Sequence, residues 1–327
     1  MAKKGEDPKV RMARLQSAAD GDPAALPAAV RLALRDPHPL PVARAAQLCD
    51  ERLLYDLEAD LVAAFERLRP LDYKCDPQCM AKGAIVRALV ALDFQDAEVY
   101  RVGIRLRQAE PVWGGSVDTA VDLRATSAMG LVQTRYPRAL IDLVSLLADP
   151  EPRARAGAAR AIACAEPLAA EALLRAKALL GDAEPEVVGE CLAGLLQVEP
   201  EETPGFVAGF LDAADPAIRE QAALALGTCR LDLALELLRE RWDAEPLKRE
   251  PHRILLRGAI LHRSEAAFDW LLDVVARGDP NTAAWLVEGL SVYRANARLG
   301  ERLRAVVEAR GKPPVTVAWQ GAWGAVS

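Results

Sequence analysis

The feature that most limits the fold of this 327-residue chain is a short phrase that recurs along it. In each copy an acidic residue, often followed by Pro, precedes a helical stretch that ends in small residues and one aliphatic residue. Eight copies at a period of 30 to 42 residues cannot arise by chance, and such periods are typical of repeat architectures. The closing aliphatic residues are Leu48, Leu89, Leu131, Ile162, Leu195, Leu226, Ile260 and Leu290.

The recurring phrase has a mechanical explanation. An Asp at a helix N-cap accepts hydrogen bonds from free amides, and Pro fits the next position because no amide partner is lost there. The Ala and Gly residues that follow let the helix approach a neighbour closely. A second stretch with apolar residues three and four apart comes after each phrase, so each unit is expected to be a helix hairpin. We predict an all-α, right-handed α-solenoid of about eight hairpins.

Both ends of the chain depart from the repeat. Residues 1–35 are expected to form an N-terminal helical cap, residues 36–310 the repeat solenoid and residues 311–327 a C-terminal tail. Because solenoid ends need covering, Trp319 and Trp323 are expected to dock onto the last hairpin. A disordered tail that binds a partner is the alternative. Only 5% of the residues are aromatic and β-branched residues are few, so no β-sheet is expected.

The net charge of −6 bears on the class of partner. Binding to nucleic acid usually needs an excess of Lys and Arg on one face, so nucleic acid is not expected as a partner. No run reaches the roughly eighteen apolar residues of a membrane helix, and the N-terminus lacks the apolar core of a signal peptide. The protein is therefore expected in the cytoplasm, without contact to a membrane. Six cysteines in such a chain do not indicate a disulfide framework.

Two of the phrases, DPEPRARAGAARAI (149–162) and DPAIREQAALAL (215–226), carry a family resemblance. They resemble the short HEAT-like repeats of the phycocyanobilin-lyase type, and the resemblance covers roughly residues 36–310. The signature patterns of tetratricopeptide and ankyrin repeats are absent. The resemblance implies a fold rather than a function, because the same repeat occurs in scaffolds, lyases and DNA-repair enzymes.

The repeat is interrupted between the second and third hairpins, where the segment EPVWGGSVD (110–118) is inserted. Insertions between repeats map to loops on one face, which is often the binding face. The alternative is that Trp113 fills a gap left by the longer connection, while Gly114 and Gly115 supply positive φ angles. The candidate binding site comprises the insertion and the arginines that flank it: Trp113, Asp118, Arg101, Arg105, Glu110 and Arg124.

Cys75 and Cys79 raise the question of a metal. A C-x3-C spacing is tolerated by zinc, but a structural site needs four ligands, and no second Cys or His pair follows nearby. No metal or cofactor is predicted. Cys79 follows Asp76-Pro77 at a helix start, near Lys82, and one interpretation is a reactive thiol with a lowered pKa. A half-buried structural cysteine is the alternative.

Three classes of function remain open. The leading one is a non-catalytic scaffold or adaptor that binds a protein partner along the concave face of the solenoid, since no catalytic motif is present. The second, implied by the resemblance alone, is a bilin-lyase-like enzyme or chaperone subunit with Cys79 and Asp118 as its nucleophile or acid. The third is a HEAT-like DNA glycosylase that uses Trp113 and Asp118, which the acidic net charge disfavours.

Overall fold

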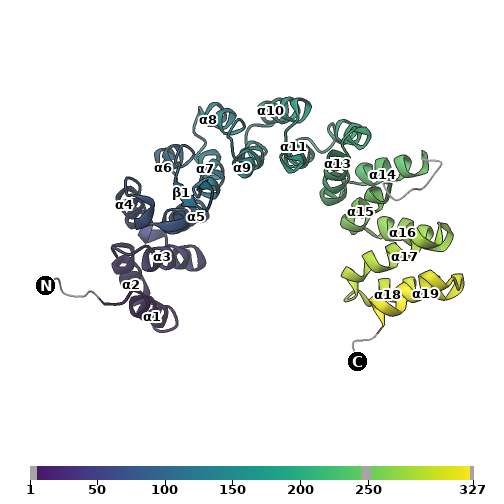
Figure 1. Cartoon of the computed structure of the whole chain (residues 1–327), viewed down its shortest axis with the longest axis horizontal. Helices are drawn as coiled ribbons and strands as arrows, with labels where there is room; N and C mark the ends of the chain where they lie inside the picture. The colour runs from purple at the N-terminus through teal and green to yellow at the C-terminus, as the bar shows by residue number, and fades with distance from the viewer. Residues whose placement is uncertain (1–5, 245–251, 325–327) are drawn as a thin grey trace. The chain divides into compact units, whose positions relative to one another are not determined.

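The computed structural model describes residues 6–244 and 252–324, and its helices pair into hairpins (Figure 1). The chain divides into two compact units, Met1–Glu166 and Pro167–Ser327. Each unit is an all-α stack of hairpins, apart from one short β-hairpin in the first, and the predicted solenoid class is thereby confirmed. The boundaries expected at residues 35 and 310 stay a prediction. Within the described ranges, none of the helices combines the length and apolarity needed to cross a bilayer.

In the first unit, the leading helices of successive hairpins pack against one another in a row. This row consists of α3, α5, α7 and α9, and the second helices α4, α6 and α8 alternate with it along the chain. The bounds in this unit are α1 (Pro8–Ala19), α2 (Leu26–Leu34), α3 (Pro39–Arg52), η1 (Tyr55–Leu57), α4 (Glu58–Leu68), η2 (Tyr73–Cys75), η3 (Pro77–Cys79), α5 (Met80–Ala91), α6 (Ala97–Gly103), β1 (Ala109–Val112), β2 (Gly115–Asp118), α7 (Val121–Gln133), α8 (Ala139–Leu146) and α9 (Pro152–Ile162).

The second unit repeats this arrangement, with α11, α13 and α15 packed in succession and α19 packed on α17. The bounds here are α10 (Pro167–Leu180), α11 (Pro185–Val198), α12 (Pro204–Ala208), η4 (Gly209–Asp212), α13 (Pro216–Cys229), α14 (Asp232–Ala244), α15 (Arg253–His262), α16 (Glu265–Arg277), α17 (Pro280–Gly289), η6 (Leu290–Tyr293), α18 (Ala297–Arg310) and α19 (Pro313–Trp323).

The closing aliphatic residues of the repeat form the spine of each core. All eight are buried, seven of them at 0 or 1% exposure and Ile260 at 7%. Close approach between leading helices depends on the small residues of the phrase. A Cβ added to Gly157 in α9 would lie 2.4 Å from the Cβ of Ala125 in α7, so the two helices leave no room for a methyl group. The predicted role of the small residues is confirmed at this contact.

The acidic residue of the phrase organises the start of the leading helix in two ways. Asp215 is the N-cap of α13 and accepts a hydrogen bond from the Ala217 amide at 2.8 Å, as expected. The N-cap role is wrong for Asp36, Asp76, Asp118 and Asp182, because α3, α5, α7 and α11 have other residues at the N-cap. It is also wrong for Asp149, which lies two residues before the cap of α9 and accepts from the Glu151 amide at 2.9 Å. There the carboxylate holds the turn between hairpins. The copy at Glu245 lies outside the described residues.

The C-terminal tail docks as expected over Pro313–Trp323, which forms α19. Trp319 and Trp323 stack with their ring centroids 5.2 Å apart. The indole Nε1 of Trp323 donates to the carbonyl of Val287 in α17 at 2.9 Å. The tail therefore supplies one more helix to the end of the stack, and the alternative of a disordered tail is wrong for these residues.

The expectation that the chain has no sheet is wrong at one place. β1 and β2 pair antiparallel, from Ala109 opposite Asp118 to Val112 opposite Gly115. Gly114 has a φ of +88°, a positive value of the kind that a type II turn requires at its third position. Gly115 does not have a positive φ angle, so that part of the expectation is wrong. Four-residue strands joined by a tight turn need only local pairing, which an overall composition that favours helix does not prevent.

Candidate binding site at the inserted hairpin

The inserted segment between α6 and α7 is this β-hairpin, and its tip is fully exposed. Trp113 at the turn has 103% of its reference area accessible, and Val112 and Val117 beside it are about half exposed. A Cβ added at Gly114 would meet no atom within 4 Å. The interpretation in which Trp113 fills a packing gap is therefore wrong.

The first of two anchors at the base of the hairpin is Glu110. Its Oε1 accepts hydrogen bonds from the backbone amide of Gln78 at 2.6 Å, from Thr119 Oγ1 at 2.7 Å and from Gln108 Nε2 at 2.9 Å. Burial raises the pKa of Glu110, but these hydrogen bonds and the Lys82 charge lower it by more, so its pKa lies below its ordinary value. Glu110 is thus an ionised acceptor that joins the hairpin to the turn before α5.

That turn carries backbone strain and a buried charge. Gln78 and Cys79 have φ angles of +59° and +52°, which are uncommon for residues other than glycine. The ammonium of Lys82 is 1% exposed, donates to Gln108 Oε1 at 2.5 Å and lies 3.7 Å from Asp76 Oδ2. Asp76 also accepts from the amides of Ala81 and Lys82 at 2.8 and 3.1 Å. These contacts give the buried ammonium and carboxylate the partners that such groups need.

The second anchor at the base is a chain of alternating charges that begins at Asp118, on the other strand. Asp118 Oδ1 accepts from the amides of Gln108 and Ala120, and its Oδ2 accepts from Arg124 Nη1 at 2.7 Å. Arg124 is 0% exposed and binds Asp149 through two further hydrogen bonds, while the half-exposed Arg107 adds an ion pair to Asp149 at 2.7 Å. The last strand residue is thereby joined to the turn before α9.

The structure brings three of the six candidate residues into this base, namely Glu110, Asp118 and Arg124. Arg101 and Arg105 belong to a different cluster, because both form ion pairs with Asp142 in α8, at 3.5 and 2.7 Å. Arg101 also stacks over the Tyr136 ring, with the guanidinium carbon 5.1 Å from its centroid. Whether the six residues bind a partner stays a prediction.

Further residues of the base were absent from the predicted site, namely Asp76, Lys82, Arg107, Gln108, Thr119 and Asp149. A signal for one of them was present. Lys82 lies six positions after Asp76, the acidic residue of its phrase, just as Arg124 of the predicted site lies six positions after Asp118. Asp149 could not be connected to the insertion by sequence, since its arginine partner lies 25 residues earlier in another repeat.

The cysteines next to this base do not form a reactive pair. Cys79 is buried, and its pKa is raised to about 12, chiefly by burial and then by neighbouring carboxylates against the opposing Lys82 charge. The expectation of a lowered pKa is therefore wrong. Cys75 is exposed. In the part of the chain that the structure describes, no group of three or more His, Cys, Asp or Glu residues is placed to hold a metal ion.

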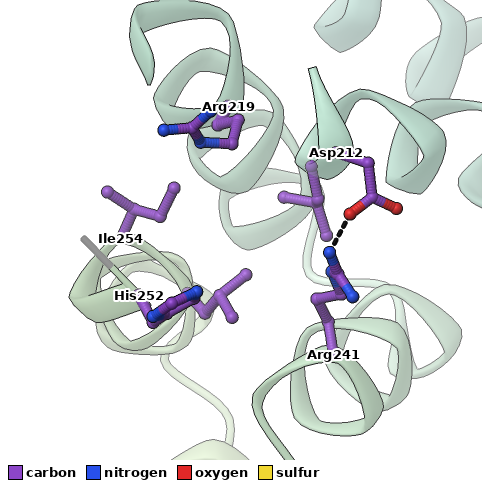
Figure 2. Close-up of a pocket in the computed structure, with 7 residues that line it drawn as sticks. Asp212, Arg219, Arg241, His252 and Ile254 are labelled. Atoms are coloured by element: carbon purple, nitrogen blue, oxygen red, sulfur yellow. Dashed lines mark hydrogen bonds and ion pairs between the residues drawn. The ribbon is translucent and has the colours of Figure 1, made fainter. Parts of the chain in front are cut away.

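A cavity of about 350 Å³ lies in the second unit between η4, α13, α14 and α15 (Figure 2). Its charged residues are engaged within the protein. Arg241 pairs with Asp212, and Arg219 donates to the carbonyls of Ala213 and Ala214. Arg155 makes the same two contacts to the turn before its own helix, so this role belongs to the repeat. The lining residues are Leu211, Asp212, Arg219, Arg241, His252, Ile254 and Leu255.

No family model matches the sequence, and no curated protein matches it. Among solved structures, the chain is similar to the complex of CpcE and CpcF of phycocyanin lyase from Nostoc, at 16% identity and a TM-score of 0.36 over 74% of this chain and 92% of that one. A crystal structure of an engineered protein is similar at 14% identity and a TM-score of 0.35, over 99% and 93% of the two chains. The stacked hairpins themselves make this chain an all-α helical-repeat protein.

Proposed function

We propose that the protein is a non-catalytic interaction scaffold that binds a protein partner through the inserted hairpin. The observation that carries the proposal is Trp113, a fully exposed tryptophan at the tip of a hairpin whose base is buried and hydrogen-bonded. Tryptophan is enriched among the residues that dominate binding energy at protein interfaces. In this proposal Trp113 enters a pocket of the partner, and Val112 and Val117 contact the apolar rim of that pocket.

The anchoring of the base supports this function. A two-stranded hairpin of this length is marginally stable in water when it stands alone. Here Glu110 joins one strand to the turn before α5, and Asp118 joins the other to Arg124 in α7. The tip is therefore held in one orientation before any partner arrives, which lowers the entropy lost on binding.

The chemistry of the base supports binding over catalysis. The pKa of Asp118 is raised by burial but lowered by more through two backbone amides and Arg124, so the carboxylate is ionised at neutral pH. A carboxylate committed in this way is a poor general acid. The thiol of Cys79 is buried and its pKa of about 12 leaves it protonated, which removes the nucleophile that a lyase-like role would use.

A pull-down from native lysate with a matched pair of variants tests the proposal. Trp113→Ala removes the tip, and Tyr55→Ala removes another exposed aromatic of the same unit, which is 55% exposed. We expect a specific protein to be captured by wild type and Tyr55→Ala and lost with Trp113→Ala. Both variants should melt within about 1 °C of wild type, since exposed side chains contribute little to stability.

Photo-crosslinking from position 113 then identifies the captured protein by mass spectrometry, with the same probe at position 55 as control. Equal capture by the two alanine variants, together with equal crosslinking from both positions, would overturn the hairpin as the binding element. A third variant, Glu110→Gln, keeps Trp113 but weakens the base. We expect a Kd for the captured partner that is about 3- to 10-fold weaker, because the hairpin then has to be ordered on binding.

A further inference from the structure

The outer face of α10 exposes an unusual amount of apolar surface. Leu168, Leu179 and Leu180 are 74%, 70% and 85% exposed. Single exposed leucines are common on soluble proteins, but contiguous exposed apolar surface marks an interaction site. The exposed residues between these leucines are also apolar, since they include Ala172 and Ala176.

Four of these residues, all except Leu180, line up along one side of the helix. Leu168 and Leu179 are eleven positions apart, so they lie about 20° apart around the helix axis and about 16 Å apart along it. Ala172 lies between them, about 40° from Leu168. We call Leu168, Ala172, Ala176 and Leu179 the leucine face. Leucines at both ends and alanines in the middle allow a second helix to lie close along its whole length.

One flank of the leucine face carries an ordered charge pair. Glu171 accepts a hydrogen bond from Arg175 Nε at 2.8 Å. The guanidinium of Arg175 also lies over the ring of Phe206 in α12, 4.4 Å from its centroid, and Phe206 packs edge-to-face on Phe210. Both aromatic rings are half-buried, so the apolar surface continues from α10 onto α12.

We propose that a second copy of this chain covers the leucine face, with the two α10 helices antiparallel about a two-fold axis beside Leu173 and Leu174. In this register, Leu168 of one copy lies against Leu179 of the second copy, and Leu179 against Leu168. The alanines meet at the centre. A two-fold interface requires one patch to be complementary to itself, and a face with leucines at both ends meets that requirement.

The order of charges selects a second copy over another partner. The two-fold axis is perpendicular to the plane that contains the two α10 helices. The flank that carries Glu171 and Arg175 in one copy therefore lies beside the same flank of the second copy. Glu171 of one copy then lies near Arg175 of the second, and Arg175 near Glu171, which gives an alternating ring of four charges. Phe206 and Phe210 of both copies flank the ring, so that α10 and α12 from each copy form the interface.

Sedimentation velocity across a series from about 1 to 100 µM chain measures the assembly directly. We expect wild type to reach twice the chain mass of 35.3 kDa. Leu179→Glu should weaken the dimer Kd by more than about tenfold, because it places two carboxylates in the apolar contact. The matched control is Leu32→Glu, since Leu32 on α2 is also 70% exposed. A wild type that stays monomeric throughout, or a dimer unaffected by Leu179→Glu, overturns the proposal.

A charge-swap experiment tests the partner and the register together. Glu171→Arg alone places four cations in the ring, and Arg175→Glu alone places four anions there, so each variant should be mainly monomeric. Mixing the two should restore a dimer of unlike chains. The corresponding swaps at the exposed pair Arg304 and Glu308 on α18 serve as controls and should leave the dimer unchanged.

If circular dichroism shows that a charge variant is unfolded, disulfide crosslinking between introduced cysteines tests the same partner and register. With the exposed Cys75 and Cys164 replaced by Ser, Leu168→Cys and Leu179→Cys chains, mixed and oxidised, should form a disulfide between unlike chains, whereas each alone should not. Crosslinking of Leu179→Cys to itself as readily as to Leu168→Cys overturns the antiparallel register. The surface lies apart from the inserted hairpin in the sequence and shares no residue with it, so its failure leaves the proposed function unaffected.

Discussion

Arg124 and Asp149 are joined by two parallel hydrogen bonds, Nε to Oδ2 at 3.0 Å and Nη2 to Oδ1 at 3.1 Å, with both side chains sealed from water. Arg124 belongs to α7, and Asp149 to the turn before α9. The same guanidinium binds Asp118 at the end of the hairpin. One buried arginine therefore joins the hairpin, its own repeat and the next repeat.

Removing this arginine should destabilise the first unit strongly. Arg124→Met leaves the buried carboxylate of Asp149 with the half-exposed Arg107 as its remaining ion-pair partner, and we expect a loss of about 3–5 kcal/mol in the free energy of unfolding by urea. Arg153→Ala is the matched control, because Arg153 also joins α9 to α7, through Asp122, but is 76% exposed. It should cost less than about 1 kcal/mol. Equal losses for the two variants would contradict the assigned role of burial.

The anchors of the hairpin should make the first unit sensitive to acid. The folded pKa values of Glu110 and Asp118 lie below their ordinary values of 4.5 and 3.8. The unfolded chain therefore binds protons first, so the stabilisation is fully present above about pH 5 and is lost as the pH falls through the lowered pKa values. Urea midpoints measured from pH 6 down to 3 should decline less steeply for Glu110→Gln than for wild type. Parallel declines would show that Glu110 contributes nothing to the acid sensitivity.

The two cysteines next to the hairpin should differ in reactivity. Cys75 is exposed, whereas Cys79 is buried with its pKa raised to about 12. Because the thiolate is the reacting species, maleimide should modify Cys79 at least about 100-fold more slowly than Cys75 at neutral pH. Peptide mapping by mass spectrometry separates the two sites. Comparable modification rates at the two cysteines would support Cys79 as a nucleophile and count against a purely binding role of the protein.

Two glycine substitutions should have opposite effects on stability. Gly157→Ala presses a methyl group to 2.4 Å from the Cβ of Ala125, where α9 crosses α7, and should cost about 1–3 kcal/mol. A Cβ at Gly205 in α12 meets no atom within 4 Å, so Gly205→Ala should stabilise by about 0.5–1 kcal/mol through helix propensity. Thermal melts of both variants measure the contrast, and a tolerated Gly157→Ala would show that the leading helices can move apart.

The fold could be predicted because its information is local and repeated. The acidic residue, often followed by Pro, the small residues and the closing aliphatic residue recur along the chain, and the eight aliphatic positions are all buried. The β-hairpin could not be predicted in the same way. Its strands contain few β-formers, and its turn depends on the positive φ of the single residue Gly114.

The candidate site was predicted in part, for a related reason. Glu110 and Asp118 lie at the two ends of the insertion, and strand pairing brings them to its base. Arg105 is close to the insertion in sequence, yet its guanidinium pairs with Asp142, 37 residues later. Side-chain pairs between successive repeats span one repeat length, and sequence alone does not show which of many charges meet across that distance.

The exposed tip of the hairpin is structurally separate from the packed repeats. Residues Val112–Gly115 contribute almost nothing to the packing of the repeats, whereas Arg124, which holds the base of the hairpin, is fully buried. Under the proposed function, the residues that contact the partner can therefore change without a change in the stack that supports them. A variant in which a different four-residue loop replaces residues 112–115 should fold as the parent protein does and bind a different partner.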